Sequence, residues 1–193
     1  MKLLHIDSSA LASHSVSRQL TAAIVARWQA QVPGLKVTYR DLDTEPLPHL
    51  TGAVLSKADA AIAEASEQTL QQFLDADVVV IGAPMYNFGV PSTLKAWIDR
   101  IAVAGRTFRY TEHGPEGLAG DKKVIIASAR GSQHGDGAVS DFQEAYLKFV
   151  LGFLGVRDVE FVRAEGVGLS PQHRVEAIDK ALASIPEVVR QAA

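Results

Sequence analysis

The chain has 193 residues, a mass of 20.7 kDa, 47% hydrophobic residues and a formal net charge of −3. This length fits a single domain with a sizeable core, which we expect to span residues 1–193, and so mild a charge indicates no nucleic acid partner. Because the chain has no cysteine, disulfides, thiolate metal sites and cysteine nucleophiles are all excluded.

Two further features concern location and metals. The first residues become polar too early for a signal peptide, and no apolar run is long enough to span a membrane. We therefore expect a soluble, cytoplasmic protein with no membrane partner. The 6 histidines show no metal-binding spacing and no carboxylate cluster accompanies them, so we expect no metal.

Predicted strands and helices alternate along the whole chain. The expected strands are residues 2–6, 35–42, 78–81, 122–128 and 159–164, and the expected helices are residues 16–31, 56–76, 91–103, 141–154 and 171–191. The helix at 56–76 is either continuous or broken once. Residues 105–120 are expected to be irregular, with one extended piece at 107–111 and turns at 113–117. Such alternation is typical of a parallel sheet with helices on both faces. For five strands the simplest order is 2-1-3-4-5, the doubly wound, flavodoxin-like α/β arrangement.

The stretch from residue 78 to residue 91 is the most informative part of the chain. Residues 78–81 are β-branched and apolar, which suits a strand buried on both faces. Residues 85–88 then bring a methionine, two aromatic side chains and an asparagine to the strand end, where open α/β sheets bind ligands. Large apolar groups with one amide suit a flat heteroaromatic ring. The same composition also fits a hydrophobic loop that only closes the end of the sheet.

The loop after the first strand is rich in serine. Ser9, Ser15 and Ser17 lie around the expected start of the first helix, where N–H groups are free to bind a phosphate. The chain has no Gly-rich Walker loop and no G-x-G-x-x-G motif, which argues against nucleoside triphosphates and Rossmann-type dinucleotides. Arg18 is the nearest cation, so the loop suits a terminal monophosphate held by hydroxyls and dipoles. An ordinary loop with one capping serine fits the same residues.

The loop after the fourth expected strand, residues 129–138, is rich in glycine, which lets backbone N–H groups approach a ligand. In this topology the loops after the first, third and fourth strands meet at one cleft. Together they offer a phosphate pocket, an aromatic wall and a donor-rich edge. FMN, a mononucleotide with a large flat ring, is the obvious fit.

The residues that match a known family extend over almost the whole chain. They are residues 7–9, 15–17, 83–91, 107–112, 114–118 and 158–166, among which the run Met85-Tyr86-Asn87-Phe88 is the most specific. In these segments the chain resembles the FMN-dependent NADH azoreductases, also described as NADH:quinone oxidoreductases. The resemblance implies a flavodoxin-like homodimer with one tightly bound FMN per subunit and with NADH as electron donor.

The resemblance also implies a set of site residues. The expected FMN-binding residues are Ser9, Ser15, Val16, Ser17, Pro84, Met85, Tyr86, Asn87, Phe88, Ala129, Arg130, Gly131, Ser132 and His134. Ser132 departs from the family, whose loop often reads Arg-Gly-Gly. His134 is expected near the N1/O2 edge of the ring, although a surface loop histidine fits the same position. The substrate slot is expected to consist of Tyr86, Tyr110 and Phe153, the last two partly from the neighbouring subunit.

A second feature points to the dimer. Residues 145–154 are more apolar and aromatic than one buried helix face requires, and surplus apolar surface often marks an interface. A well-buried core helix is the alternative interpretation.

The implied function is reduction of small aromatic acceptors. Quinones would be reduced and azo compounds cleaved to amines, by ping-pong hydride transfer from NADH through FMN. No catalytic side chain is expected, because the flavin carries the chemistry. The alternative is a flavin-binding electron carrier or regulatory module, although carriers of this fold tend to be more acidic than −3. A phosphodiesterase would need a nucleophile or a metal, and we find neither in the sequence.

Overall fold

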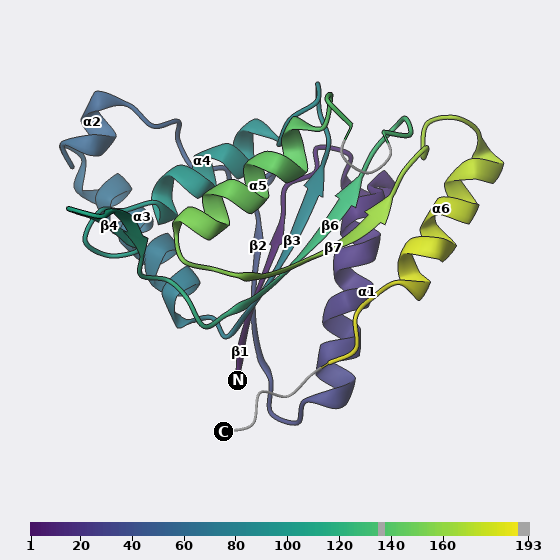
Figure 1. The fold of residues 1–193 in the computed structure, drawn as a ribbon, viewed down its shortest axis with the longest axis horizontal. Helices are drawn as coiled ribbons and strands as arrows, with labels where there is room; N and C mark the ends of the chain where they lie inside the picture. Colours follow the sequence, from purple (N-terminus) through teal and green to yellow (C-terminus); the bar gives the residue numbers. More distant parts are fainter. Residues whose placement is uncertain (135–137, 189–193) are drawn as a thin grey trace.

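The protein, a computed structural model that describes residues 1–134 and 138–188, has three layers (Figure 1). The middle layer is a parallel sheet of five strands in the order β2-β1-β3-β6-β7. These strands are β1 (Lys2–Asp7), β2 (Lys36–Asp41), β3 (Val78–Pro84), β6 (Lys123–Ala129) and β7 (Asp158–Ala164). All seven residues of β3 are buried, because β3 is central and has helices on both faces.

The helices form the two outer layers. One face of the sheet is covered by α1 (Val16–Gln31) and α6 (Pro171–Ala183), and the other by α3 (Ala60–Asp75), α4 (Ser92–Ile101) and α5 (Phe142–Phe153) (Figure 1). Two short helices, η1 (Ala12–His14) and α2 (Gly52–Leu55), lie in the connections. Each face buries its own apolar cluster, one around Leu20 and Trp28 and the other around Phe73 and Trp97. Both faces of the sheet are therefore filled, and the strand ends are left for a site.

The expected strand order 2-1-3-4-5 is wrong in its numbering. Residues 105–120, expected to be largely irregular, contain a separate antiparallel hairpin of β4 (Phe108–Thr111) and β5 (Gly114–Gly117). The expected turns at 113–117 are mostly strand, because their backbone pairs with 108–111. Since the hairpin does not join the main sheet, the last two strands of the sheet are β6 and β7, and the order is 2-1-3-6-7.

Several element ends also differ from expectation. The helix expected from residue 56 begins only at Ala60, because Asp59 caps α3 by accepting hydrogen bonds from the N–H groups of Ala61 and Ile62. The closing helix, expected to reach residue 191, ends at Ala183, shortly before Pro186, whose ring is incompatible with a helix interior. The first helix lies where it was expected, at 16–31.

Among the residues that the structure describes, none of the helices is both long and apolar enough to cross a membrane.

Candidate functional site

Three loops meet at the edge of the sheet where the strands end. They follow β1, β3 and β6, which are neighbours in the sheet. The hydroxyl of Tyr86, in the second loop, lies 3.1 Å from Ser9 Oγ and accepts a hydrogen bond from the Ala10 N–H at 3.2 Å. The Met85 N–H donates to the carbonyl of Ala129 at 2.9 Å, which ties the second loop to the third. The expected convergence of the three loops is therefore present.

The first loop gathers buried serine hydroxyls at the N-terminus of α1. Ser15 is the N-cap, and its Oγ accepts a hydrogen bond from the Arg18 N–H at 3.2 Å. The same oxygen lies 3.1 Å from Ser17 Oγ, and Ser9, Ser15 and Ser17 are all buried. The first N–H groups of a helix have no acceptor within the helix, so this corner presents hydroxyls and amide donors together. That set of donors fits a phosphate monoester.

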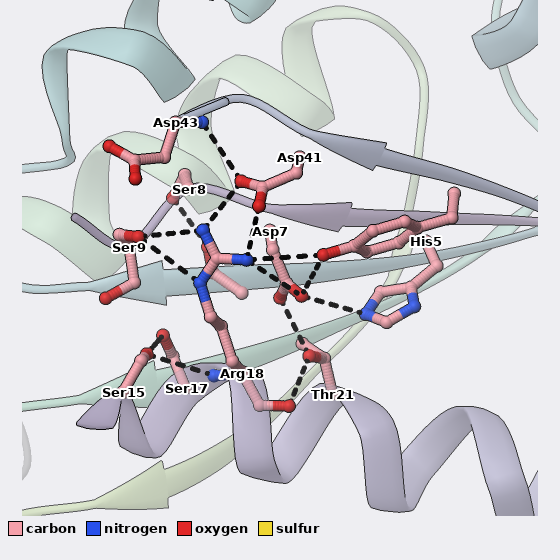
Figure 2. A network of polar contacts seen from close by, with 12 residues as sticks. His5, Asp7, Ser8, Ser9, Ser15, Ser17, Arg18, Thr21, Asp41 and Asp43 are labelled. Carbon is pink, nitrogen blue, oxygen red and sulfur yellow. Dashed lines mark hydrogen bonds and ion pairs between the residues drawn. The ribbon is translucent and has the colours of Figure 1, made fainter. Parts of the chain in front are cut away.

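Arg18, the cation nearest to these serines, is already paired (Figure 2). Its guanidinium donates to both carboxylate oxygens of Asp41, at 2.7 and 2.6 Å, and to the carbonyl of Ser9 at 3.3 and 2.9 Å. These hydrogen bonds from Arg18 hold the pKa of Asp41 below its ordinary value. Sequence reasoning missed Asp41, which lies at the end of the neighbouring strand β2 and carries no motif.

The second loop is a tight turn. Tyr86 and Gly89 exchange two backbone hydrogen bonds, at 3.1 and 3.0 Å, around Asn87 and Phe88. Both central residues have left-handed backbone angles, with φ of 49° and 68°. This conformation costs a residue with a side chain roughly 1–2 kcal/mol, and it is uncommon for a bulky aromatic. The turn directs the exposed Phe88 side chain outward, while Tyr86 reaches back to the first loop.

The buried side chain of Arg130 anchors the third loop to the protein interior. The Arg130 side chain is 1% exposed and pairs with Asp141 at 2.8 Å, Glu144 at 2.7 Å and Glu165 at 3.0 Å. Its guanidinium therefore points into the protein, and the carbonyls of residues 130–132 accept hydrogen bonds from the N–H groups of residues 166–168. Gly135 to Gly137, part of the same expected Gly-rich loop, lie outside the described residues.

His134 is held at both ring nitrogens. One nitrogen, Nε2, lies 3.0 Å from Ser132 Oγ, and Nδ1 lies 3.1 Å from Ser140 Oγ. The ring also meets Phe88 edge to face, with centroids 6.3 Å apart. The serine that replaces the usual glycine at position 132 thus fixes a histidine beside the second loop.

Two expected slot residues, Tyr110 and Phe153, do not join the three loops within one chain. Phe153 is the last residue of α5, about 16 Å of helix away from the end that follows the third loop. It packs on Phe108 of the hairpin, with ring centroids 4.6 Å apart, and Tyr110 is 76% exposed beside the same ring. A cavity of about 820 Å³ lies between the hairpin and the chain that follows α5, and Phe153 lines it.

Sequence reasoning also missed an apolar groove beside the second loop. Its volume is about 680 Å³, and its walls include Tyr86, Val90, Phe142 and Tyr146. Phe142 and Tyr146 lie in the first turns of α5, directly after the Gly-rich loop. Their position in the chain was the only signal that could have placed them here. A planar ring against residues 85–88 would have this groove as its neighbour.

Within residues 1–134 and 138–188, no group of three or more histidine, aspartate or glutamate side chains is arranged to hold a metal ion.

The sheet order and the three loops define a flavodoxin-like protein, built to hold a ligand at the carboxyl edge of its sheet. Residues 1–189 match the family described as "Flavodoxin-like fold", to which the chain belongs. Within this fold it belongs to the FMN-dependent NADH:quinone oxidoreductases, as two curated relatives show. The oxidoreductase of that name from Stenotrophomonas maltophilia is 62% identical over 100% of both chains. "FMN-dependent NADH:quinone oxidoreductase 1" of Xanthomonas axonopodis is 64% identical over 97% of this chain and 96% of its own.

Solved structures agree with this membership. An azoreductase from Bacillus anthracis has a TM-score of 0.86 and 32% identity, over 96% of each chain. An FMN-dependent NADH-azoreductase from the same species, solved in complex with FMN, has a TM-score of 0.87 and 26% identity over 95% of each chain. The resemblance expected from the sequence is confirmed, and with it membership in an enzyme family.

Proposed function

We propose that the protein binds FMN at the three loops and uses NADH to reduce quinones, with aromatic azo compounds as further acceptors. The observation that carries this proposal is the meeting of Tyr86 with Ser9, because it brings a phosphate corner and an aromatic loop to one edge of the sheet. The names of the curated relatives and of the azoreductase structures support the same chemistry.

The phosphate of FMN would lie at the start of α1. Ser9, Ser15 and Ser17 would donate their hydroxyls, and the backbone N–H of Val16 would donate along the helix axis. Since Arg18 is engaged by Asp41, hydroxyls and amides would carry the interaction. Several such bonds to a charged group are strong enough to keep the cofactor tightly bound.

The flavin ring would lie against the second and third loops. Residues 84–88 would supply its wall, with Asn87 at one polar edge, and the backbone of residues 129–132 would face the other. His134, oriented by Ser132 and Ser140, would lie at the N1/O2 side.

FMN, when bound, accepts a hydride from NADH and passes two electrons to the acceptor. The chain needs no general base for this chemistry, so its task is to orient the ring and to exclude water. Since donor and acceptor would use one open face in turn, we expect ping-pong kinetics. A quinone consumes one NADH, and an azo bond cleaved to two amines consumes two.

The protein would act as a homodimer. Phe142, Ala145, Phe149 and Gly152 are exposed and form one stripe along α5, and 75% of Phe149 is open to solvent. An apolar stripe of this kind suits a second copy of the chain. Tyr110 and Phe153, which lie away from the loops of their own chain, would then complete the acceptor slot of the partner.

The experiment is to purify the full-length protein, record its flavin spectrum and follow NADH oxidation with a quinone. We expect oxidised-flavin bands and rapid NADH consumption without any protein partner. When the concentrations of NADH and quinone are both varied, double-reciprocal plots of the rate should give the parallel lines of ping-pong kinetics. An electron carrier would bind flavin but would consume NADH slowly, and that outcome would replace our proposal with the carrier. Counting NADH consumed per azo dye cleaved then tests the second acceptor class.

A further inference from the structure

Arg18 connects the loop that carries Ser9 to Asp41, at the end of strand β2, by hydrogen bonds to both residues (Figure 2). Arg18 donates from Nε and one terminal nitrogen to the Ser9 carbonyl, at 3.3 and 2.9 Å. Both terminal nitrogens donate to Asp41, at 2.7 and 2.6 Å. One rigid guanidinium therefore connects the first loop to the end of β2, and such planar double contacts fix orientation as well as distance.

The surroundings of this ion pair favour its staying together. The side chains of Arg18 and Asp41 are each only 15% exposed. A second carboxyl group, that of Asp7, lies 3.9 Å from Arg18, and the Tyr39 hydroxyl accepts a hydrogen bond from Arg18 at 3.2 Å. If Arg18 turned away to pair with a phosphate, Asp41 would remain in this half-closed corner without its cation, which is costly.

We propose that Arg18 and Asp41 are positioning residues for the phosphate corner. By fixing the Ser9 carbonyl, they set the direction of the Ser9 hydroxyl, which also lies 3.3 Å from the Leu11 N–H that donates to it. They act through Ser9 and do not touch the phosphate. This inference rests on the proposed FMN site and adds a prediction specific to it: the pair determines how strongly the protein prefers FMN to riboflavin, which lacks the phosphate.

The decisive variant is Asp41→Asn, because it separates positioning from direct charge pairing. If Arg18 contacted the phosphate directly, removal of its competitor would leave FMN affinity unchanged or raise it. If the pair positions Ser9, the loosened guanidinium no longer fixes the carbonyl, and FMN affinity falls roughly tenfold or more. Arg18→Lys makes the complementary change, because it keeps the charge and loses the planar fork.

The experiment titrates the full-length chain, freed of flavin, with FMN and with riboflavin, and follows flavin fluorescence. The variants are Asp41→Asn and Arg18→Lys, together with the double variant Arg18→Gln/Asp41→Asn in case a lone charge prevents folding. The matched control is Glu67→Gln, which breaks another arginine–carboxylate pair, with Arg106, on the surface of α3. Thermal unfolding of each variant reports whether the fold is retained.

We expect all three site variants to lose FMN affinity while riboflavin affinity stays within about twofold, and the control to bind both flavins like the wild type. Equal losses of affinity for the two flavins would indicate a merely structural role and overturn the inference. Wild-type FMN affinity in Asp41→Asn, or in Arg18→Lys, would overturn it as well. In each of these cases a wild-type protein that prefers FMN leaves the proposed function intact. A wild-type protein that binds neither flavin overturns both.

Discussion

At the scale of single residues, Gly82 shows how a small side chain protects the polar corner beneath the site. A Cβ at this position would lie 2.6 Å from Asp7 Oδ1 and 3.2 Å from Thr21 Cγ2. Asp7 cannot easily move away, because it accepts hydrogen bonds from Thr21 at 2.8 Å and Tyr39 at 3.1 Å. Glycine therefore lets β3 run directly beside a carboxyl group of β1.

We predict that Gly82→Ala lowers the free energy of unfolding by about 1–3 kcal/mol, the usual cost of overpacking. Urea denaturation measures it. Gly52→Ala serves as the control, because no atom lies within 4 Å of a Cβ built there. Equal stability of the two alanine variants would contradict the clash at Gly82.

The Arg18–Asp41 pair predicts a dependence of stability on pH. Hydrogen bonds from Arg18 lower the pKa of Asp41 in the folded protein. A depressed pKa contributes stability that is present above the unfolded value, near 3.9, and is lost as the pH falls through the folded value. We therefore expect the unfolding free energy of the wild type to fall below about pH 4, and that of Asp41→Asn to fall less steeply. Denaturant titrations at pH 7, 4 and 3 compare the slopes, and parallel pH profiles would contradict this role of Asp41.

At the scale of elements, the β4–β5 hairpin depends on a close approach of two backbones. A Cβ at Gly117 would lie 2.1 Å from the backbone nitrogen of Gly155, in the chain that follows α5. The Ala119 N–H donates to the Leu154 carbonyl at 2.8 Å at the same junction. The contact between Phe108 and Phe153 depends on this docking.

We predict that Gly117→Ala displaces the hairpin, and with it Tyr110, without removing the flavin, because the three loops lie at the other end of the sheet. The expected result is a several-fold rise in KM for bulky acceptors with unchanged flavin content. Steady-state kinetics with a small and a bulky quinone measure the change in KM, with Gly52→Ala as the control variant. Wild-type KM values for both quinones would contradict a role of the hairpin in the acceptor slot. Loss of flavin from Gly117→Ala would contradict the prediction that the hairpin acts on the acceptor alone.

At the scale of the whole molecule, the exposed stripe of α5 is the surface on which we propose that two copies of the chain meet. Phe149 is 75% exposed, so a charge there has little effect on the fold of a single chain. We predict that Phe149→Glu yields a folded monomer that retains FMN and loses most acceptor reduction, because Tyr110 and Phe153 would no longer reach the other subunit.

Sedimentation at assay concentration and NADH oxidation test this prediction together. The control is Val175→Glu on α6, which places the same charge at another exposed apolar residue, 56% open to solvent. A monomeric Phe149→Glu with full activity would show that each chain has a complete site of its own.

The local features of this chain are those that the sequence alone determined. The β-branched run at 78–81 indicated a strand covered on both faces, and the serines at 15 and 17, either of which could cap a helix, indicated the start of α1 near residue 16. Such signals act between residues only a few positions apart, so they can be read without knowing the rest of the fold. The Met85-to-Phe88 run was specific enough to indicate the family.

The contacts that complete the candidate site were decided only by the tertiary structure. Arg18 and Asp41 are 23 positions apart, and they meet because β1 and β2 pair side by side. The hairpin forms because residues 108–111 and 114–117 pair with each other, although Pro115 and two glycines favour turns. Arg130, whose position suggested a ligand contact, turned inward because three carboxylates from α5, its N-cap and the chain after β7 surround it. Each of these outcomes depends on which distant segments pack together, and no local propensity encodes that choice.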